Sequence, residues 1–263
     1  MNLDLQNKNA LVGGSSKGIG KAIAIELAQM GASVTLMARS EDVLKEVVAG
    51  LDTSKGQEHH YLVADFSNPE QLKATVDAHL ASLAKPMHIL INNTGGPPGG
   101  PITNASPEEF NSAYSNHLIC NQLLAQACLA GMKEAGYGRI INVISTSVRQ
   151  PLKGLGVSNT VRGAVGNWAK TWSFEVAPFG ITVNNVLPGA TATERLSSII
   201  SNKAAKTGQS EEQVENAMLS AIPAARFAEP NEVAAAAAFL ASPAAAYING
   251  INIPVDGGRL TGY

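Results

Sequence analysis

The stretch Gly13-Gly14-Ser15-Ser16-Lys17-Gly18-Ile19-Gly20 decides how this chain folds. It follows a short apolar run at 9–12 and opens a helical pattern over 18–30. Glycines at this spacing allow a tight turn between a strand and a helix, and they let backbone N–H groups approach a pyrophosphate at the positive end of that helix. The stretch therefore predicts a dinucleotide site formed by Gly14, Ser16, Lys17, Gly18, Ile19 and Gly20.

The rest of the chain alternates short β-branched runs with longer helical patterns. We expect strands at 9–12, 33–38, 60–63, 88–91, 139–143, 181–186 and 251–255, and helices at 18–30, 41–49, 69–83, 107–135, 159–177 and 231–240. Most of the strand runs are continuously apolar, as in parallel strands that are buried on both faces. The pattern predicts an α/β fold with a single doubly wound (Rossmann) parallel sheet of about seven strands and helices on both faces.

Length and composition favour one domain over residues 1–263. Hydrophobic residues make up 45% of the 263 positions and charged residues 15%, so a chain of this size buries roughly three quarters of its unfolded surface without disulfides or metals. The polar segment 191–223 interrupts the alternation before the last helix. Insertions at the carboxyl ends of strands often cover substrate sites, so we expect a substrate lid there, with a surface helical hairpin as the alternative.

Several classes of partner and compartment are disfavoured. The formal net charge is −2 and no lysine or arginine run occurs, so we expect no nucleic acid partner. No apolar run approaches the ~20 residues that span a bilayer, and the first residues do not resemble a signal peptide. Cys120 and Cys128 fall on one predicted helix and are expected to be buried thiols, without a disulfide. These features predict a cytoplasmic protein without a metal site or membrane contact.

The end of the second predicted strand indicates the type of cofactor. It reads Met37-Ala38-Arg39-Ser40, without the carboxylate that an NAD site uses to hold the ribose 2′-hydroxyl. Arg39 offers a planar fork that suits a phosphate, and Lys17 adds a second positive charge on the same side. Charge-assisted contacts of this kind contribute roughly 1.5–3 kcal/mol each. We therefore expect NADP(H), with Arg39 and Ser40 in the site; a solvated Arg39 at the start of a helix is the alternative.

Further motifs make the chain resemble the short-chain dehydrogenase/reductase family over nearly its whole length. They are Gly14-x-x-x-Gly18-x-Gly20, Asp65 after the third strand, Asn92-Asn93-Thr94-Gly95, Pro188-Gly189-x-x-x-Thr193 and the tail 249–258. Within the family the chain is most similar to a divergent branch of 3-oxoacyl-acyl-carrier-protein reductases that carries Gly-Gly-Pro-Pro, here at 95–98. The resemblance implies cofactor contacts from Asp65 at the adenine and from Phe66, Asn92, Asn93, Thr94, Gly95, Arg162, Pro188, Gly189, Thr191 and Thr193.

The resemblance also implies four catalytic positions, of which two are altered. Asn116 and Ser145 match the family's Asn and Ser. The family's Tyr should follow that Ser by thirteen residues and its Lys by four more, and these positions hold Ser158 and Arg162. The helix that follows, from Gly163 onward, keeps the family register, so misalignment does not explain the change.

A serine is a much weaker acid than a tyrosine, and losing a general acid costs ~10²–10⁴ in rate. One reading is a working reductase of a carbonyl, first of all a 3-oxoacyl thioester, in which Ser145, Ser158 and Asn116 position a water while Arg162 stabilises negative charge. Another is a protein that binds NADP(H) without turnover, as a sensor or an inactive partner subunit. The third is a substitute acid, for which Arg149 and Lys153 stand in the right loop, although both read more simply as solvated charges.

Three further expectations concern a side chain in the long helix, a loop contact and assembly. His117 reads as a packed helix residue. The family has Thr where Gly13 stands and Ala where Thr94 stands, so we expect the Thr94 hydroxyl to make the hydrogen bond between these two loops. The last helix and last strand resemble those that join family members into tetramers, so we expect a homotetramer, with a dimer as second choice.

Overall fold

The computed structural model describes residues 1–262 and contains a seven-stranded sheet in the order β3-β2-β1-β4-β5-β6-β7. Every neighbouring pair of strands is parallel. The strands are β1 (Asn9–Gly13), β2 (Ser33–Ala38), β3 (His60–Val63), β4 (Ile89–Asn92), β5 (Gly138–Val143), β6 (Ile181–Pro188) and β7 (Asn252–Val255). The predicted doubly wound sheet is confirmed.

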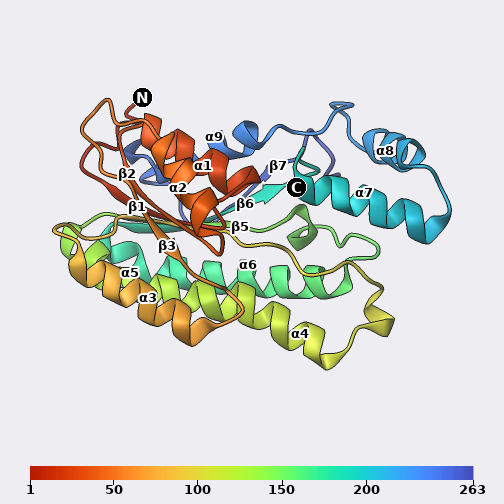
Figure 1. Cartoon of the computed structure of the whole chain (residues 1–263), viewed down its shortest axis with the longest axis horizontal. Coiled ribbons are helices and arrows are strands. Elements are labelled where there is room, and N and C mark those ends of the chain that lie inside the picture. Colours follow the sequence, from red (N-terminus) through yellow and green to blue (C-terminus); the bar gives the residue numbers. More distant parts are fainter. Residues whose placement is uncertain (263) are drawn as a thin grey trace.

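Helices cover both faces of this sheet, as Figure 1 shows. One face carries α1 (Gly18–Gln29), α2 (Glu41–Ala49) and α9 (Pro230–Ala241), and the other carries α3 (Pro69–Ser82), α5 (Cys120–Ala135) and α6 (Gly156–Val176). Each layer packs its own apolar core against the strands. The small residues Ala24 and Ala28 of α1 and Ala234, Ala237 and Ala238 of α9 are all buried there, which lets the two helices approach closely.

The long helix predicted at 107–135 is interrupted. It consists of α4 (Pro107–Tyr114), a π-helical segment Ser115–Ile119 and α5. A π-helical turn inside an α-helix often marks a functional site. Periodicity over 107–135 does not reveal such a turn, because the apolar pattern continues through it.

Four asparagines form a hydrogen-bonded row across the carboxyl half of the sheet. The amide nitrogen of Asn92 on β4 donates to Asn142 on β5, that of Asn142 to Asn185 on β6, and that of Asn185 to Asn252 on β7, each at 2.8 Å. The strand register places each asparagine directly beside the next. Within residues 1–262 the first acceptor of the row, Asn92 Oδ1, is buried without a hydrogen bond.

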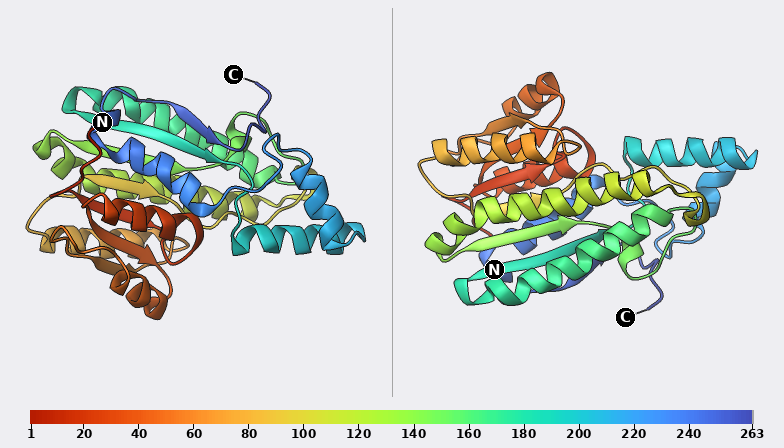
Figure 2. Two further views of the ribbon diagram at one scale, coloured as in Figure 1. Left: turned by 90° about the horizontal axis from the view of Figure 1, so that it is seen from above. Right: turned by 90° about the horizontal axis from the view of Figure 1, so that it is seen from below.

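The segment 191–223 projects beyond the carboxyl edge of the sheet (Figure 1, Figure 2). It contains α7 (Glu194–Thr207) and α8 (Glu211–Leu219), which pack on each other through Leu196, Ile200, Ala204 and Val214. The segment is therefore a helical hairpin in form. Its first turn contacts the glycine-rich turn through the Lys17–Glu194 ion pair.

Candidate active site

The glycine-rich turn joins β1 to α1 and is closed to side chains at several points. Gly14 and Gly18 adopt φ of +56°, a left-handed conformation that favours glycine. A Cβ on Gly20 would lie 2.2 Å from the carbonyl oxygen of Gly14. The turn thus presents bare backbone at the start of a helix, which is the geometry that binds a pyrophosphate.

A second loop, after β4, braces this turn. Asn93 Nδ2 donates to the carbonyl oxygens of Gly13 and Gly14, at 3.1 and 3.2 Å. The expectation that the Thr94 hydroxyl makes this contact is wrong, since that hydroxyl has no hydrogen bond among the described residues. The Asn93 side chain, rather than that of Thr94, makes the hydrogen bonds between the two loops.

Buried Ser15, which sequence reasoning did not select, ties the turn to the neighbouring strand. Its Oγ accepts a hydrogen bond of 2.8 Å from the Met37 N–H. Ser16, in contrast, is half-buried and points to no described partner. Ser15 could have been predicted to make this contact, because it comes just after β1 and the end of β2 lies beside it in a parallel sheet.

Arg39 and Ser40 are exposed at the end of β2, on the rim of the cofactor side. Asp65 follows β3, and the Ser67 N–H together with the nearby Arg39 charge lowers the pKa of its carboxyl group. Phe66 is buried against Gly13, and its carbonyl oxygen accepts a hydrogen bond from Cys120 Sγ. Among the described residues, Phe66 therefore keeps its backbone N–H free to donate to a cofactor.

Lys17 is not the free second cation that the sequence predicted. Its ammonium forms an ion pair with Glu194, the first residue of α7. Both side chains are exposed, at 69% and 73%, and exposed pairs of this kind contribute at most about 1 kcal/mol. The pair neutralises Lys17 locally and joins the hairpin to the glycine-rich turn.

The motif that follows β6 shapes the entrance to the hairpin. Pro188 ends β6, and Gly189 lies so close to Asp256 that a Cβ would be 2.8 Å from the Asp256 Cα. Buried Thr191 donates to the Gly189 carbonyl oxygen. Thr193 caps α7, and its methyl group lies 3.3 Å from the position that a Cβ on Gly18 would take.

The altered catalytic positions, Ser158 and Arg162, lie in the first two turns of α6, and Arg162 reaches the end of β5. Ser145 follows β5 and accepts a hydrogen bond from the Ser147 N–H. Ser158 and Arg162 are four residues apart on α6, which places them on one face of the helix. Arg162 is only 8% exposed, and its Nη1 donates to the Val143 carbonyl oxygen at 2.9 Å.

Arg162 has no carboxylate partner in the described part of the chain. Burial, with a contribution from Arg195, lowers the pKa of its guanidinium to about 10. The group is still positively charged at neutral pH. The structure therefore places a fixed, uncompensated cation where the resemblance implies a lysine.

Asn116 and His117 lie in the π-helical segment. Asn116 is half-buried and lines a cavity of about 380 Å³, together with Gly95, Gly96, His117 and Val157. Burial and the nearby Arg162 lower the pKa of His117 to about 2. The expected packed character of His117 is confirmed, because the ring is 2% exposed and stays neutral.

Sequence reasoning missed Arg195 on α7. Its Nη2 donates to the Pro97 carbonyl oxygen at 2.7 Å, across the mouth between the hairpin and the loop after β4. The two cations proposed for the loop before α6, Arg149 and Lys153, are exposed. No local motif marks Arg195, because its role depends on contact with a residue 98 positions away.

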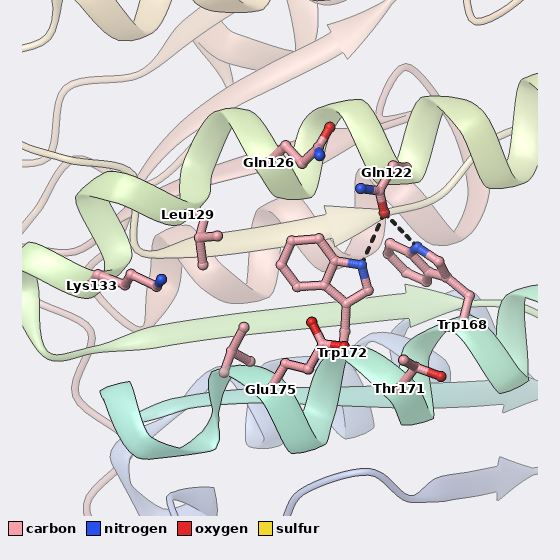
Figure 3. A pocket seen from close by; sticks show the side chains of 9 residues that line it. Gln122, Gln126, Leu129, Lys133, Trp168, Thr171, Trp172 and Glu175 are labelled. Carbon is pink, nitrogen blue, oxygen red and sulfur yellow. Dashed lines mark hydrogen bonds between the residues drawn. The ribbon is translucent and has the colours of Figure 1, made fainter.

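A larger cavity, of about 500 Å³, lies between α5 and α6 away from these residues (Figure 3). There Gln122 Oε1 accepts hydrogen bonds from the indoles of Trp168 and Trp172, at 2.7 and 3.0 Å. It contains none of the predicted site residues. Of its polar groups, the Gln122 oxygen and the two indole N–H groups are paired with one another.

The remaining features concern metals, thiols and membranes. Cys120 and Cys128 are buried free thiols, as expected. In residues 1–262 no cluster of three His, Cys, Asp or Glu side chains could bind a metal ion. None of the helices described here combines the length and the apolar character needed to cross a bilayer.

Comparison with known proteins places this arrangement in a family. A family model described as "Enoyl-(Acyl carrier protein) reductase" matches residues 14–259. The 3-oxoacyl-acyl-carrier-protein reductase FabG of Vibrio cholerae is 35% identical over 257 residues, covering 97% of this chain and 98% of the relative. The NADPH-dependent reductase BacG of Bacillus subtilis is 29% identical over 256 residues, covering 97% and 99%.

Two solved structures have the same fold over the full length. The NADPH-dependent reductase YwfH, involved in bacilysin biosynthesis, superposes with a TM-score of 0.91 at 30% identity, covering 97% of this chain and 99% of that one. The L-sorbose reductase of Gluconobacter frateurii, complexed with NADPH and L-sorbose, gives a TM-score of 0.92 at 30% identity with both chains fully covered. The chain belongs to the short-chain dehydrogenase/reductase family.

Proposed function

We propose that the protein is an NADP(H)-dependent oxidoreductase that reduces a carbonyl to an alcohol, with 3-oxoacyl thioester-like ketones as the first substrates to try. Relatives named as NADPH-dependent reductases and as 3-oxoacyl-acyl-carrier-protein reductases support this. The serine and arginine in place of tyrosine and lysine put the chain in a divergent branch of the family. One domain carries the site, and the hairpin 191–223 serves as its substrate lid.

The residues at the glycine-rich turn fit a dinucleotide. A Cβ at Gly20 would collide with the turn, which leaves a backbone cradle for the pyrophosphate beside Ser16, Lys17, Gly18 and Ile19. Arg39 is the cation best placed for the 2′-phosphate, with Ser40 beside it. Asp65, Phe66, Asn92, Asn93, Thr94, Gly95, Pro188, Gly189, Thr191 and Thr193 are the remaining residues proposed to line the cofactor site. When bound, NADPH supplies a hydride.

The observation that carries the proposal for the chemistry is the buried, unpaired Arg162 guanidinium. An isolated buried cation is costly unless something negative faces it. Negative charge that develops on the substrate oxygen during reduction would meet this cation in a site of low polarity, where such interactions are strongest. Arg162 thus stabilises the oxygen anion, while Ser145, Ser158 and Asn116 hold the water that delivers the proton. The hydroxide left behind takes a proton from the solvent.

A second candidate reaction is reduction of a carbon–carbon double bond conjugated to a carbonyl. The same observation favours it, because hydride addition to the far carbon leaves an enolate. An enolate needs a nearby positive charge more than it needs an acid at the moment of reaction. The family model's description as an enoyl reductase is consistent with this chemistry.

The test is NADPH consumption by the native protein and by the Ser158→Tyr/Arg162→Lys double variant. The substrate panel contains 3-oxoacyl thioesters, diketones, quinones and conjugated enones. We expect turnover by the native protein that the double variant does not improve. Turnover by the double variant alone would overturn the proposal and favour an NADP(H)-binding sensor or an inactive partner subunit.

Assembly is a separate part of the proposal. In the segment between α9 and β7, Tyr247 is fully exposed and Ile251 is partly exposed. Exposed apolar side chains of this kind are typical of contacts between subunits. We propose a homotetramer that uses α9 and β7. Sedimentation of the native protein at micromolar concentration tests this, and a monomer would contradict it.

A further inference from the structure

Two guanidinium groups lie against the loop after β4. Arg195 comes from the first turn of α7, and Arg162 comes from the second turn of α6. If Gly96 carried a Cβ, that atom would lie 3.6 Å from Nη2 of Arg195 and 3.8 Å from Nη2 of Arg162. The two cations therefore converge on one glycine from different elements.

The like charges are not neutralised within the described residues. Neither arginine forms an ion pair, whereas Lys17 and Arg226 both do. The neighbour of Arg195 in sequence, Glu194, is already paired with Lys17. Two positive charges this close repel each other, and the repulsion is strongest where one of them is buried.

Both guanidinium groups also have donors to spare. A guanidinium carries five N–H donors. The side chain of Arg162 uses Nη1 on Val143, and that of Arg195 uses Nη2 on Pro97. A planar acceptor with two oxygens, placed beside Gly96, would satisfy one donor from each arginine and remove the repulsion between them.

The 380 Å³ cavity that Gly96 lines also has acidic side chains in its wall. Glu108 and Glu109 line it from α4. The carboxylate of Glu109 accepts a hydrogen bond from the Ser106 N–H in the capping box of that helix. Within the described residues neither carboxylate forms an ion pair with Arg162 or Arg195.

We infer that the substrate carries a carboxylate, held between Arg195 and Arg162 beside Gly96. This rests on the proposed function, because it places the charged group of the substrate next to the group that is reduced. Since Arg162 faces both, the carboxylate and the reducible carbonyl are close neighbours in the substrate. A 2-oxo or 3-oxo carboxylic acid, or an enone bearing a carboxylate, has this arrangement. A 3-oxoacyl thioester lacks the free carboxylate, so the inference favours free acids over the thioesters proposed above.

Binding of hexanoate, measured by ligand-detected NMR in the presence of NADP⁺, tests the carboxylate site without any turnover. We expect the Arg195→Met variant to bind hexanoate about 10- to 100-fold more weakly than the native protein. Arg195→Lys keeps the charge but loses the fork, so its loss is smaller. The control is Lys203→Met, which removes an exposed cation from the same helix and leaves hexanoate binding as it is.

Equal affinity of the native protein and the Arg195→Met variant for hexanoate would overturn the inference, provided that both melt at the same temperature. Turnover measurements separate the carboxylate site from the proposed reductase activity. The native protein should have a higher kcat/KM for 2-oxohexanoate than for its methyl ester, and Arg195→Met should lower that ratio by the same factor by which it weakens hexanoate binding. Equal reduction of charged and uncharged ketones would contradict only the carboxylate site. Hexanoate binding without turnover of any substrate would contradict only the proposed reductase activity.

Discussion

The proposed cofactor side of this site is formed mainly by backbone, and the proposed substrate side mainly by charged side chains. Around Gly14, Gly18 and Gly20 the chain approaches itself so closely that side chains have no room. Around Gly96, in contrast, the neighbouring atoms are the guanidinium nitrogens of Arg162 and Arg195, at 3.6 to 4.0 Å from the position of a Cβ. The glycine-rich turn tolerates few substitutions, because any side chain there would collide with the backbone. The charged side chains around Arg162 and Arg195 can change when the charge of the substrate changes.

The largest expected effect breaks the cofactor half alone. In Gly20→Ala, the new Cβ would lie 2.2 Å from the Gly14 carbonyl oxygen, so the turn must open. We expect loss of NADPH binding, together with about 3 kcal/mol of folding stability. NADPH fluorescence titration and urea unfolding measure the two. Gly163→Ala is the matched control, because a Cβ there meets no atom within 4 Å; a similar loss in both variants would contradict the argument.

The asparagine row tests how far the sheet that carries both sides of the site depends on buried hydrogen bonds. In Asn142→Ala, the Asn92 amide loses its acceptor and the Asn185 oxygen loses its donor, both in the buried sheet. Leaving two buried polar groups unpaired should cost about 2–4 kcal/mol of folding stability. Urea unfolding provides the value. A cost below about 1 kcal/mol would mean that the row adds little to the sheet.

The preference for NADPH over NADH sharpens the comparison, because it should depend on a charged side chain, Arg39, on the proposed cofactor side. We expect Arg39→Ala to reduce the ratio of kcat/KM for NADPH over NADH by about 10- to 100-fold. Lys17→Met should change it less, since Lys17 is paired with Glu194. Steady-state kinetics with both cofactors decides this. A larger effect at Lys17 would show that its ion pair opens to hold the phosphate.

The smallest effect concerns the loop after β4. Thr94→Ala should leave folding stability within about 0.5 kcal/mol, because its hydroxyl has no described partner. Asn93→Ala should cost more, since the Asn93 amide bonds two carbonyls of the glycine-rich turn. Thermal melting of the two variants side by side would reverse our assignment if Thr94→Ala proved the more damaging.

Sequence alone predicted the features that depend on local pattern or on backbone crowding. The doubly wound parallel sheet followed from alternating apolar runs, and the turn at 13–20 followed from its glycines. The π-helical segment, the Lys17–Glu194 pair and Arg195 were not predicted. Each depends on contacts between distant segments or on a local change of helical pitch, and neither leaves a periodic signal in the chain.

The central claim is that a fixed cation, rather than a titrating acid, supports the chemistry. The pH dependence of kcat/KM for the native protein tests it most directly. His117, with a pKa of about 2, is already neutral, and the Arg162 guanidinium, with a pKa of about 10, loses its charge only as the pH rises through that value. We therefore expect a flat profile from about pH 6.5 to pH 9 that falls near pH 10. A limb with an apparent pKa of about 7 to 8 would reveal a titrating general acid and would contradict the account.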